Sequence, residues 1–313
     1  MRKLRVGVIG TGNMGKNHAR VYSEIARLAA VSDVFEASAK EVAEKFGCNY
    51  YTDYKKMMEK ENLDAVSVVV PTRLHKEVVI DTLSRKVPTL VEKPIASSLA
   101  EARLMIKKAK KEKTFLMVGH IERFNPVVIQ LKKLIEEGKI GKVMSLLSIR
   151  VGISPPKEPN SDVALDLGIH DVDVFNYLLS DFPKKKRIIK TKLFTRNIAD
   201  SATLLLEYET ITGIIQTNWI TPIKMRKLYI SGTEGYAELD YINQRLVLYE
   251  KHLEIKLDES FYDIVSLSEN LKKELYVSKK EPLKEELKFF LKNKDSRTLE
   301  MAENGILALK ILI

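Results

Sequence analysis

Short apolar runs alternate with segments of helical spacing through the first 120 or so residues of the chain. The run 65–70, A-V-S-V-V-V, is typical of a strand buried on both faces of a sheet. Other short runs lie at 4–9, 28–32 and 115–118, with predicted helices between them. Strands and helices in this order predict a parallel, doubly wound α/β sheet over residues 1–120.

The pattern changes beyond residue 120. One strand is predicted at 143–151, and six β-rich runs follow between 187 and 249, joined by short turns that contain Gly, Asn or Asp. These features predict a second, α+β domain over 121–313 with a mostly antiparallel, open-faced sheet. Helices can cover only one face of such a sheet, and its other apolar face needs a partner. We therefore expect a homodimer or homotetramer through that face. Helices that can cover one face are predicted at 126–137, 162–179, 282–292 and 298–312.

Composition excludes several kinds of partner. The 313 residues are 45% hydrophobic and 30% charged, without an apolar stretch of eighteen residues or a signal-peptide pattern, so we expect a cytoplasmic location and no membrane partner. The formal net charge is +10, but the lysines are interleaved with Glu, as at 107–113, and no nucleic-acid motif accompanies them. We therefore expect no nucleic acid partner. The single cysteine, Cys48, excludes an internal disulfide and a cysteine-rich metal site.

A G-x-G-x-x-G motif follows the first predicted strand, with the residues Gly10-Thr11-Gly12-Asn13-Met14-Gly15. Gly10 allows the tight turn out of the strand, Gly12 allows a pyrophosphate to approach the backbone, and Gly15 allows the next helix to pack closely. The start of that helix offers free N–H groups and a partial positive charge to phosphates. This context predicts a dinucleotide site in a Rossmann domain; the alternative is a chance glycine turn.

An acidic residue stands where the adenosine ribose of a dinucleotide should lie. Asp33 ends the run 28–32, eighteen positions beyond Gly15, close to the expected spacing. Its charge would repel the 2′-phosphate of NADP, and residues 34–37 contain no Arg that could accept one. The sequence therefore predicts NAD as the cofactor, in preference to NADP.

A polar loop follows the buried run 65–70. It contains Pro71, Thr72 and His75. Ligands of open α/β sheets lie beyond the carboxyl ends of the strands, so these residues are expected to face the cofactor. The alternative for His75 is an ordinary residue at the start of a helix.

The next predicted strand ends in Glu92, Lys93 and Pro94. Pro94 lacks an N–H and ends the strand, so the backbone here should be stiff and turned. Glu92 and Lys93 are therefore expected on the ligand side of the sheet, where a lysine can place a charge or a proton beside the nicotinamide. The alternative is a surface lysine before a turn.

A third cluster lies in the predicted helix 162–179. Asp166 and His170 are four residues apart, so on one helix face the carboxylate can orient and charge-stabilise the imidazole. A base that deprotonates a hydroxyl needs such a pairing; the alternative is a structural i,i+4 contact. Asp and His without cysteine or a second nearby His make a poor zinc ligand set, so we predict no metal.

The glycine motif, Glu92-Lys93-Pro94 and Asp166-x-x-x-His170, in this order in an α/β-then-β chain, resemble the Gfo/Idh/MocA oxidoreductases over essentially the whole sequence. The resemblance implies NAD(P)-dependent oxidation or reduction of sugars, inositols or sugar nucleotides. It implies catalytic roles for Lys93 and His170, with Asp166 in support. A rival of another class is a non-catalytic, NAD-linked sensor, although all three residues are present.

Segments 119–126, 218–227 and 232–235 resemble the branch of that family that oxidises UDP-N-acetyl sugars at C3. Their basic residues suit a diphosphate, which favours a UDP-sugar, with UDP-N-acetylglucosamine foremost. A free sugar or inositol remains the alternative substrate, and Trp219 could instead be a core aromatic, with Lys224 and Arg226 solvated. The candidate substrate-binding residues are Arg123, Asn125, Arg150, Trp219, Lys224 and Arg226.

Overall fold

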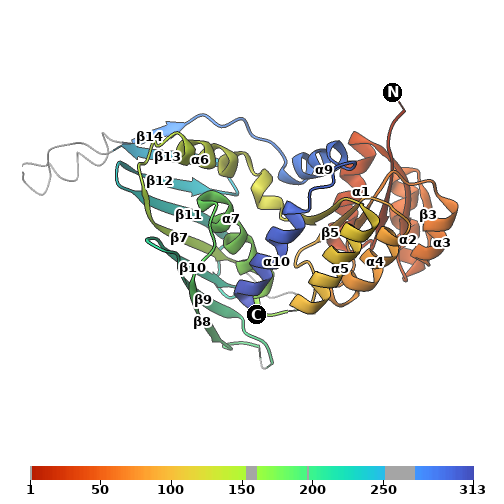
Figure 1. Cartoon of the computed structure of the whole chain (residues 1–313), viewed down its shortest axis with the longest axis horizontal. Coiled ribbons are helices and arrows are strands. Elements are labelled where there is room, and N and C mark those ends of the chain that lie inside the picture. The colour runs from red at the N-terminus through yellow and green to blue at the C-terminus, as the bar shows by residue number, and fades with distance from the viewer. Residues whose placement is uncertain (1, 153–160, 196, 251–271) are drawn as a thin grey trace, which may run out of the picture. The chain divides into compact units, whose positions relative to one another are not determined.

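The computed structural model describes residues 2–152, 161–195, 197–250 and 272–313 (Figure 1). The chain forms two compact units, each with its own β-sheet. The first unit comprises Met1–Ile121 and Glu281–Ile311 with Ile313, and the second comprises Glu122–Lys280 with Leu312.

The sheet of the first unit has six strands in the order β3-β2-β1-β4-β5-β6, and each neighbouring pair is parallel. This confirms the predicted doubly wound sheet. The order reverses between β1 and β4, which places the carboxyl ends of these two strands at the edge where such sheets bind ligands. The strands are β1 (Arg5–Ile9), β2 (Arg27–Ser32), β3 (Asn49–Tyr51), β4 (Ala65–Val68), β5 (Thr89–Glu92) and β6 (Leu116–Gly119).

Helices connect these strands, as the spacing of apolar residues predicted. Asp53 and Ser98 begin two of them, because each side chain accepts a hydrogen bond from a backbone N–H of the first turn. Strand β3 was not predicted, since its three residues are largely exposed at the sheet edge and show no apolar rhythm. The helices are α1 (Asn13–Ile25), α2 (Glu36–Phe46), α3 (Tyr54–Lys60), α4 (His75–Ser84) and α5 (Leu99–Glu112).

The two closing helices, α9 (Pro282–Lys292) and α10 (Glu300–Leu312), correct the predicted division of the chain. The prediction placed them in a second domain over 121–313, whereas residues from Glu281 onward group with the first unit. The reason is packing: α9 lies against α1, and the buried Phe290 ring stacks on Phe115 with the ring centres 6.0 Å apart. Their apolar faces therefore complete the core of the first unit.

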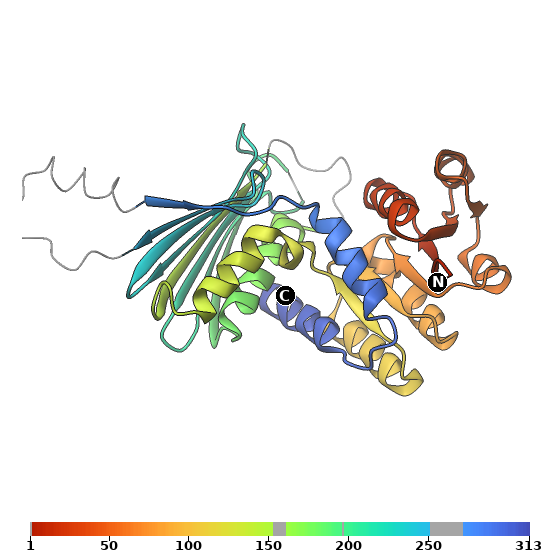
Figure 2. The same cartoon turned by 90° about the horizontal axis from the view of Figure 1, so that it is seen from above.

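The second unit contains an eight-stranded sheet in the order β14-β13-β12-β11-β7-β10-β9-β8. It is mostly antiparallel, as predicted, and β7 and β10 form a parallel pair. Helices α6 (Pro126–Glu136) and α7 (Ile169–Leu179) cover one of its faces (Figure 1 and Figure 2). The strands are β7 (Val143–Val151), β8 (Lys185–Thr191), β9 (Ser201–Glu207), β10 (Thr212–Asn218), β11 (Met225–Gly232), β12 (Gly235–Asp240), β13 (Arg245–Glu250) and β14 (Lys272–Leu275).

The opposite face of this sheet carries an apolar row. Tyr229, Leu147, Ile214 and Leu205 are register partners on four neighbouring strands, and Leu147 and Ile214 are each 38% exposed. Exposure of these apolar side chains to water is unfavourable, so we expect a second copy of the chain to cover them. The homodimer or homotetramer stays a prediction.

Candidate active site

The turn between β1 and α1 depends on two of its glycines. Gly10 has a φ of +97°, and its N–H donates to the Ser32 carbonyl at 2.7 Å, which joins β1 to β2. A β-carbon on Gly15 would lie 2.0 Å from the Gly10 carbonyl oxygen. Only glycine fits at both positions, so helix α1 begins directly against the end of β1.

The middle of this turn is open to an anion. A β-carbon on Gly12 would have no described atom within 4 Å, and Gly12, Asn13 and Met14 are exposed. The first helical bond of α1 runs from Lys16 N–H to Gly12 C=O, so the amides before Lys16 belong to the free end of the helix. This turn therefore fits the pyrophosphate of a dinucleotide.

Asp33, at the end of β2, is bound to the same turn. One carboxylate oxygen accepts from the Thr11 N–H at 2.7 Å and from the Thr11 hydroxyl at 3.0 Å, and the other accepts from Phe35 N–H at 3.0 Å. Asp33 is only partly buried, and these bonds fix its orientation beside the glycine turn. Its contact with a ribose stays a prediction that this placement supports.

The loop after β4 contains Pro71 and Thr72 at the carboxyl edge of the sheet, where a ligand is expected, but His75 does not face outward. The imidazole is 1% exposed, with Nδ1 2.9 Å from the Pro94 oxygen and Nε2 2.9 Å from the Val70 oxygen. Because both ring nitrogens meet backbone carbonyls, His75 links two loops, which corrects its predicted contact with the cofactor.

Glu92 is likewise turned inward, which changes its predicted role as a cofactor ligand. Its carboxylate meets His18 Nε2 at 3.0 Å and accepts from the Lys93 N–H at 3.1 Å. Burial opposes ionisation of Glu92, but the His18 hydrogen bond and the charges of His18 and Lys93 outweigh it and lower the pKa of Glu92. Lys93 itself is partly exposed at the end of β5.

His18 is a site residue that the sequence analysis missed. It lies in α1 and is fully buried. Its position, three residues after Gly15 on the buried face of α1, shows only that the side chain turns toward the sheet. Nothing in its immediate neighbours distinguishes it from an ordinary core histidine.

In the second unit, Asp166 lies in a short π-helix, Ala164–Gly168, and His170 lies in the α-helix that follows. This corrects the single helix predicted over 162–179, and with it the simple i,i+4 geometry assumed for the pair. π-Turns often mark functional sites because they shift the register of a helix. Trp219, the residue after β10, is buried, and its indole N–H donates to Asp166 at 3.3 Å, as expected of the alternative core aromatic.

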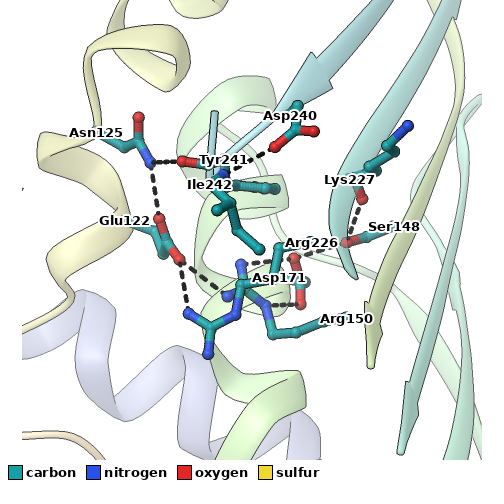
Figure 3. A network of polar contacts seen from close by, with 10 residues as sticks. All are labelled: Glu122, Asn125, Ser148, Arg150, Asp171, Arg226, Lys227, Asp240, Tyr241 and Ile242. Carbon is teal, nitrogen blue, oxygen red and sulfur yellow. Dashed lines mark hydrogen bonds and ion pairs between the residues drawn. The ribbon is translucent and has the colours of Figure 1, made fainter. Parts of the chain in front are cut away.

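A buried ionic network lies beneath the start of α7 (Figure 3). Arg150, 1% exposed, donates to both carboxylate oxygens of Asp171 at 2.6 and 3.2 Å and to Glu122 at 2.9 Å. Its guanidinium also stacks 4.9 Å from the Tyr241 ring centre. The Arg150 charge is thus already compensated inside the unit, which does not favour its predicted contact with a diphosphate, and Asp171 is the residue next to His170.

Two more predicted substrate residues are also held inside the second unit. Arg123 donates two hydrogen bonds of 2.7 Å to the Asp173 carboxylate, and both side chains are buried. Asn125 caps α6 and donates to Glu122 and to the Tyr241 carbonyl. The bidentate pair satisfies the Arg123 guanidinium, and the Asn125 amide is bonded inside the unit, so the structure favours a structural role for both residues over the predicted contact with a substrate.

Arg226 differs from these two arginines. Its side chain is 31% exposed, and one guanidinium nitrogen lies 3.9 Å from Glu122 (Figure 3). Burial and the nearby Arg150 charge lower the pKa of Arg226, although Glu122, Asp171 and Asp166 oppose this. The partly exposed guanidinium thus lies within electrostatic reach of Asp166. Lys224, in the turn before β11, is exposed.

Two further findings concern metals and membranes. Within the described ranges, no three His, Cys, Asp or Glu side chains gather in a way that could hold a metal ion. None of the described helices has the length and apolar character needed to cross a membrane. The expected cytoplasmic location stays a prediction.

Comparison with known proteins agrees with the fold and the motifs. The profile of an oxidoreductase family with an NAD-binding Rossmann fold matches residues 4–120, and that of the GFO/IDH/MocA C-terminal domain matches residues 128–238. UDP-N-acetylglucosamine 3-dehydrogenase of Acidithiobacillus ferrooxidans is 30% identical over 253 residues, which are 80% of this chain and 78% of that protein. Myo-inositol 2-dehydrogenase of Thermotoga maritima is 29% identical over 259 residues, 78% of each. The chain belongs to the GFO/IDH/MocA family and is an NAD(P)-dependent oxidoreductase.

Solved structures agree at the level of the whole chain. The Acidithiobacillus ferrooxidans UDP-N-acetylglucosamine 3-dehydrogenase matches with a TM-score of 0.84 and 26% identity, over 100% of this chain and 97% of that one. Levoglucosan dehydrogenase in complex with NADH and levoglucosan also has a TM-score of 0.84, at 18% identity, over 99% of this chain and 96% of that one. The second likeness shows the shared fold alone.

Proposed function

We propose that this enzyme oxidises a secondary hydroxyl of a sugar nucleotide, C3 of UDP-N-acetylglucosamine, with NAD. One observation carries the proposal: Arg226 offers a partly exposed cation within electrostatic reach of the Asp166 carboxylate. A neutral polyol has no use for that charge, whereas a diphosphate does. The 30% identical UDP-N-acetylglucosamine 3-dehydrogenase supports the same substrate class.

His170 acts as the general base and takes the proton of the reacting hydroxyl. Asp166 stabilises the imidazolium that forms, and Trp219 holds Asp166 by its 3.3 Å indole hydrogen bond. Lys93 donates a hydrogen bond to the same oxygen and stabilises its developing negative charge. When bound, the nicotinamide supplies the hydride acceptor, and the turn at Gly12 with Asp33 would hold the dinucleotide.

A second candidate is a dehydrogenase of inositol or of a free sugar. Two observations favour it. Arg123 and Arg150 bond carboxylates of the protein and so are not expected to bind a phosphate, and the chain is 29% identical to an inositol dehydrogenase. The two functions differ in what they require of the nucleotide half of the substrate.

A panel of substrates separates the candidates. UDP-N-acetylglucosamine, other UDP-sugars, N-acetylglucosamine and inositols are assayed with NAD by the absorbance of the reduced cofactor. We expect turnover of the UDP-sugar and competitive inhibition by free UDP. Equal use of N-acetylglucosamine and its UDP form, without inhibition by UDP, would refute the sugar-nucleotide proposal.

Replacing Arg226 by alanine should raise KM for the UDP-sugar by roughly ten- to a hundredfold, because a charged hydrogen bond contributes about 1.5–3 kcal/mol. Turnover should change comparatively little, since binding remote from the reaction is shared by ground and transition states. Lys227→Ala is the matched control, because it removes the same charge from the next residue of β11. A parent-like KM in Arg226→Ala would exclude this residue from substrate binding.

Replacing Asp33 by serine should narrow the preference for NAD over NADP. The carboxylate repels a 2′-phosphate, and serine would keep a polar group beside the turn without that charge. Dissociation constants for both cofactors, from fluorescence titration, measure the effect. Glu36→Gln is the control, since it removes a nearby charge that does not contact Thr11. An unmodified protein that binds both cofactors equally would contradict the prediction.

A further inference from the structure

Two buried imidazoles hold the residues on either side of Lys93. His18 of α1 meets the Glu92 carboxylate at 3.0 Å, and His75 of α4 meets the Pro94 carbonyl oxygen at 2.9 Å. We call His18 and His75 the histidine clamp. Both belong to the first unit, and they come from two different helices, α1 and α4.

The contact of His18 fixes the Glu92 side of the lysine. Its Nδ1 has no hydrogen-bond partner among the described residues, so the Glu92 bond through Nε2 is its only polar contact there. The other Glu92 oxygen accepts from the Lys93 N–H at 3.1 Å. A β-carbon on Gly119 would lie 3.3 Å from the carboxylate, so the end of β6 also confines it. The Glu92 carboxylate therefore connects the buried His18 ring to the backbone N–H of Lys93.

The contact of His75 fixes the Pro94 side. Its ring spans the carbonyl oxygens of Pro94 and Val70, which follow β5 and β4 respectively. Burial lowers the pKa of His75, so the ring is neutral at neutral pH and has one N–H to donate. The ring still packs between both loops, with 1% exposure, and separates them by a fixed distance.

We propose that the histidine clamp positions Lys93 for its hydrogen bond to the reacting oxygen, an inference that rests on the proposed role of Lys93. With the backbone fixed on both sides, the lysine retains only its side-chain torsions. His18 lies on the helix that begins at the glycine turn, so the same contact also sets the lysine relative to the dinucleotide turn. A misplacement of about 1 Å at such a group can cost on the order of a hundredfold in rate.

A general loss of stability is the rival explanation, and Tyr22 provides the control for it. Tyr22 lies one turn beyond His18 on α1, is fully buried, and shares a 2.7 Å hydrogen bond with Ser67 of β4. Tyr22→Phe therefore removes a buried hydrogen bond between the same helix and the same sheet, without touching Glu92. We expect it to lower the thermal midpoint and to keep the parent's turnover.

A double-mutant cycle tests the clamp. His18→Leu and His75→Leu should each lower kcat by about ten- to a hundredfold, with the NAD dissociation constant within a few fold of the parent's. His18→Gln, which keeps a donor for Glu92, should recover part of that loss. In a Lys93→Met background, His18→Leu should cause little further loss, because a residue that acts through Lys93 has nothing left to position.

The outcomes separate the clamp from the proposed function. A parent-like kcat in the two leucine variants, or the same fold-loss with and without Lys93, overturns the clamp while Lys93 keeps its role. Full activity of Lys93→Met removes the lysine from the reaction and overturns both. If His18→Leu does not fold, Glu92→Gln replaces it in the same cycle, since it retains the size of the side chain and weakens the bond to His18.

Discussion

Replacing His170 by alanine is expected to lower turnover by about 10²- to 10⁴-fold, the range for loss of a general base. The protein should still fold, because His170 is only partly buried at the start of α7, while Asp171, the next residue, keeps its bonds to Arg150 and Ser148. The pH–rate profile should also lose its acidic limb, since protonation of His170 is what abolishes proton acceptance in the parent. Steady-state kinetics from acidic to alkaline pH measure both effects.

Imidazole added to His170→Ala should restore part of the activity, because it can enter the space left by the ring and accept the proton. The matched control is imidazole added to Lys93→Met, where the missing group is a hydrogen-bond donor and no rescue is expected. An acidic limb that persists in His170→Ala would identify another base, with Lys93 the first to examine.

Replacing Lys93 by methionine is expected to lower turnover by about 10²- to 10³-fold, the loss found when one donor to a developing oxyanion is removed. NAD binding should stay close to that of the parent, because the glycine turn and Asp33 make their contacts without Lys93. Methionine retains most of the length of the lysine chain, so the change removes the charge and the donor with little change in packing. Single-turnover kinetics and an NAD titration separate the two quantities.

Lys76→Met is the control for this change. Lys76 lies on α4 of the same unit and forms a surface ion pair of 3.1 Å with Glu101, which contributes little to stability. We expect parent-like turnover for Lys76→Met. A fully active Lys93→Met enzyme would exclude the lysine from catalysis.

Local rules predicted most of the fold. Strand β7 and helix α9 have the predicted bounds, and the parallel sheet follows from the order of apolar runs. The failures lie where burial is slight or distant. Strands β3 and β14 are short edge strands with largely exposed side chains, so neither shows the alternation of apolar and polar residues that predicts a strand. The helices after residue 280 return to the first unit because their apolar faces meet α1 and Phe115, which no local pattern reveals.

The sequence by itself determined where the candidate cofactor-binding and catalytic residues lie along the chain. A glycine turn, Asp33 and Lys93 each follow a strand, and the ends of parallel strands meet at one edge of a sheet. Only the tertiary structure decided which polar groups are already paired inside each unit. Arg123 and Arg150 find carboxylates 50 and 21 residues away, and His18 finds one 74 residues away. A buried charge must be compensated, and its partner is chosen by packing across the fold, which residue spacing does not encode.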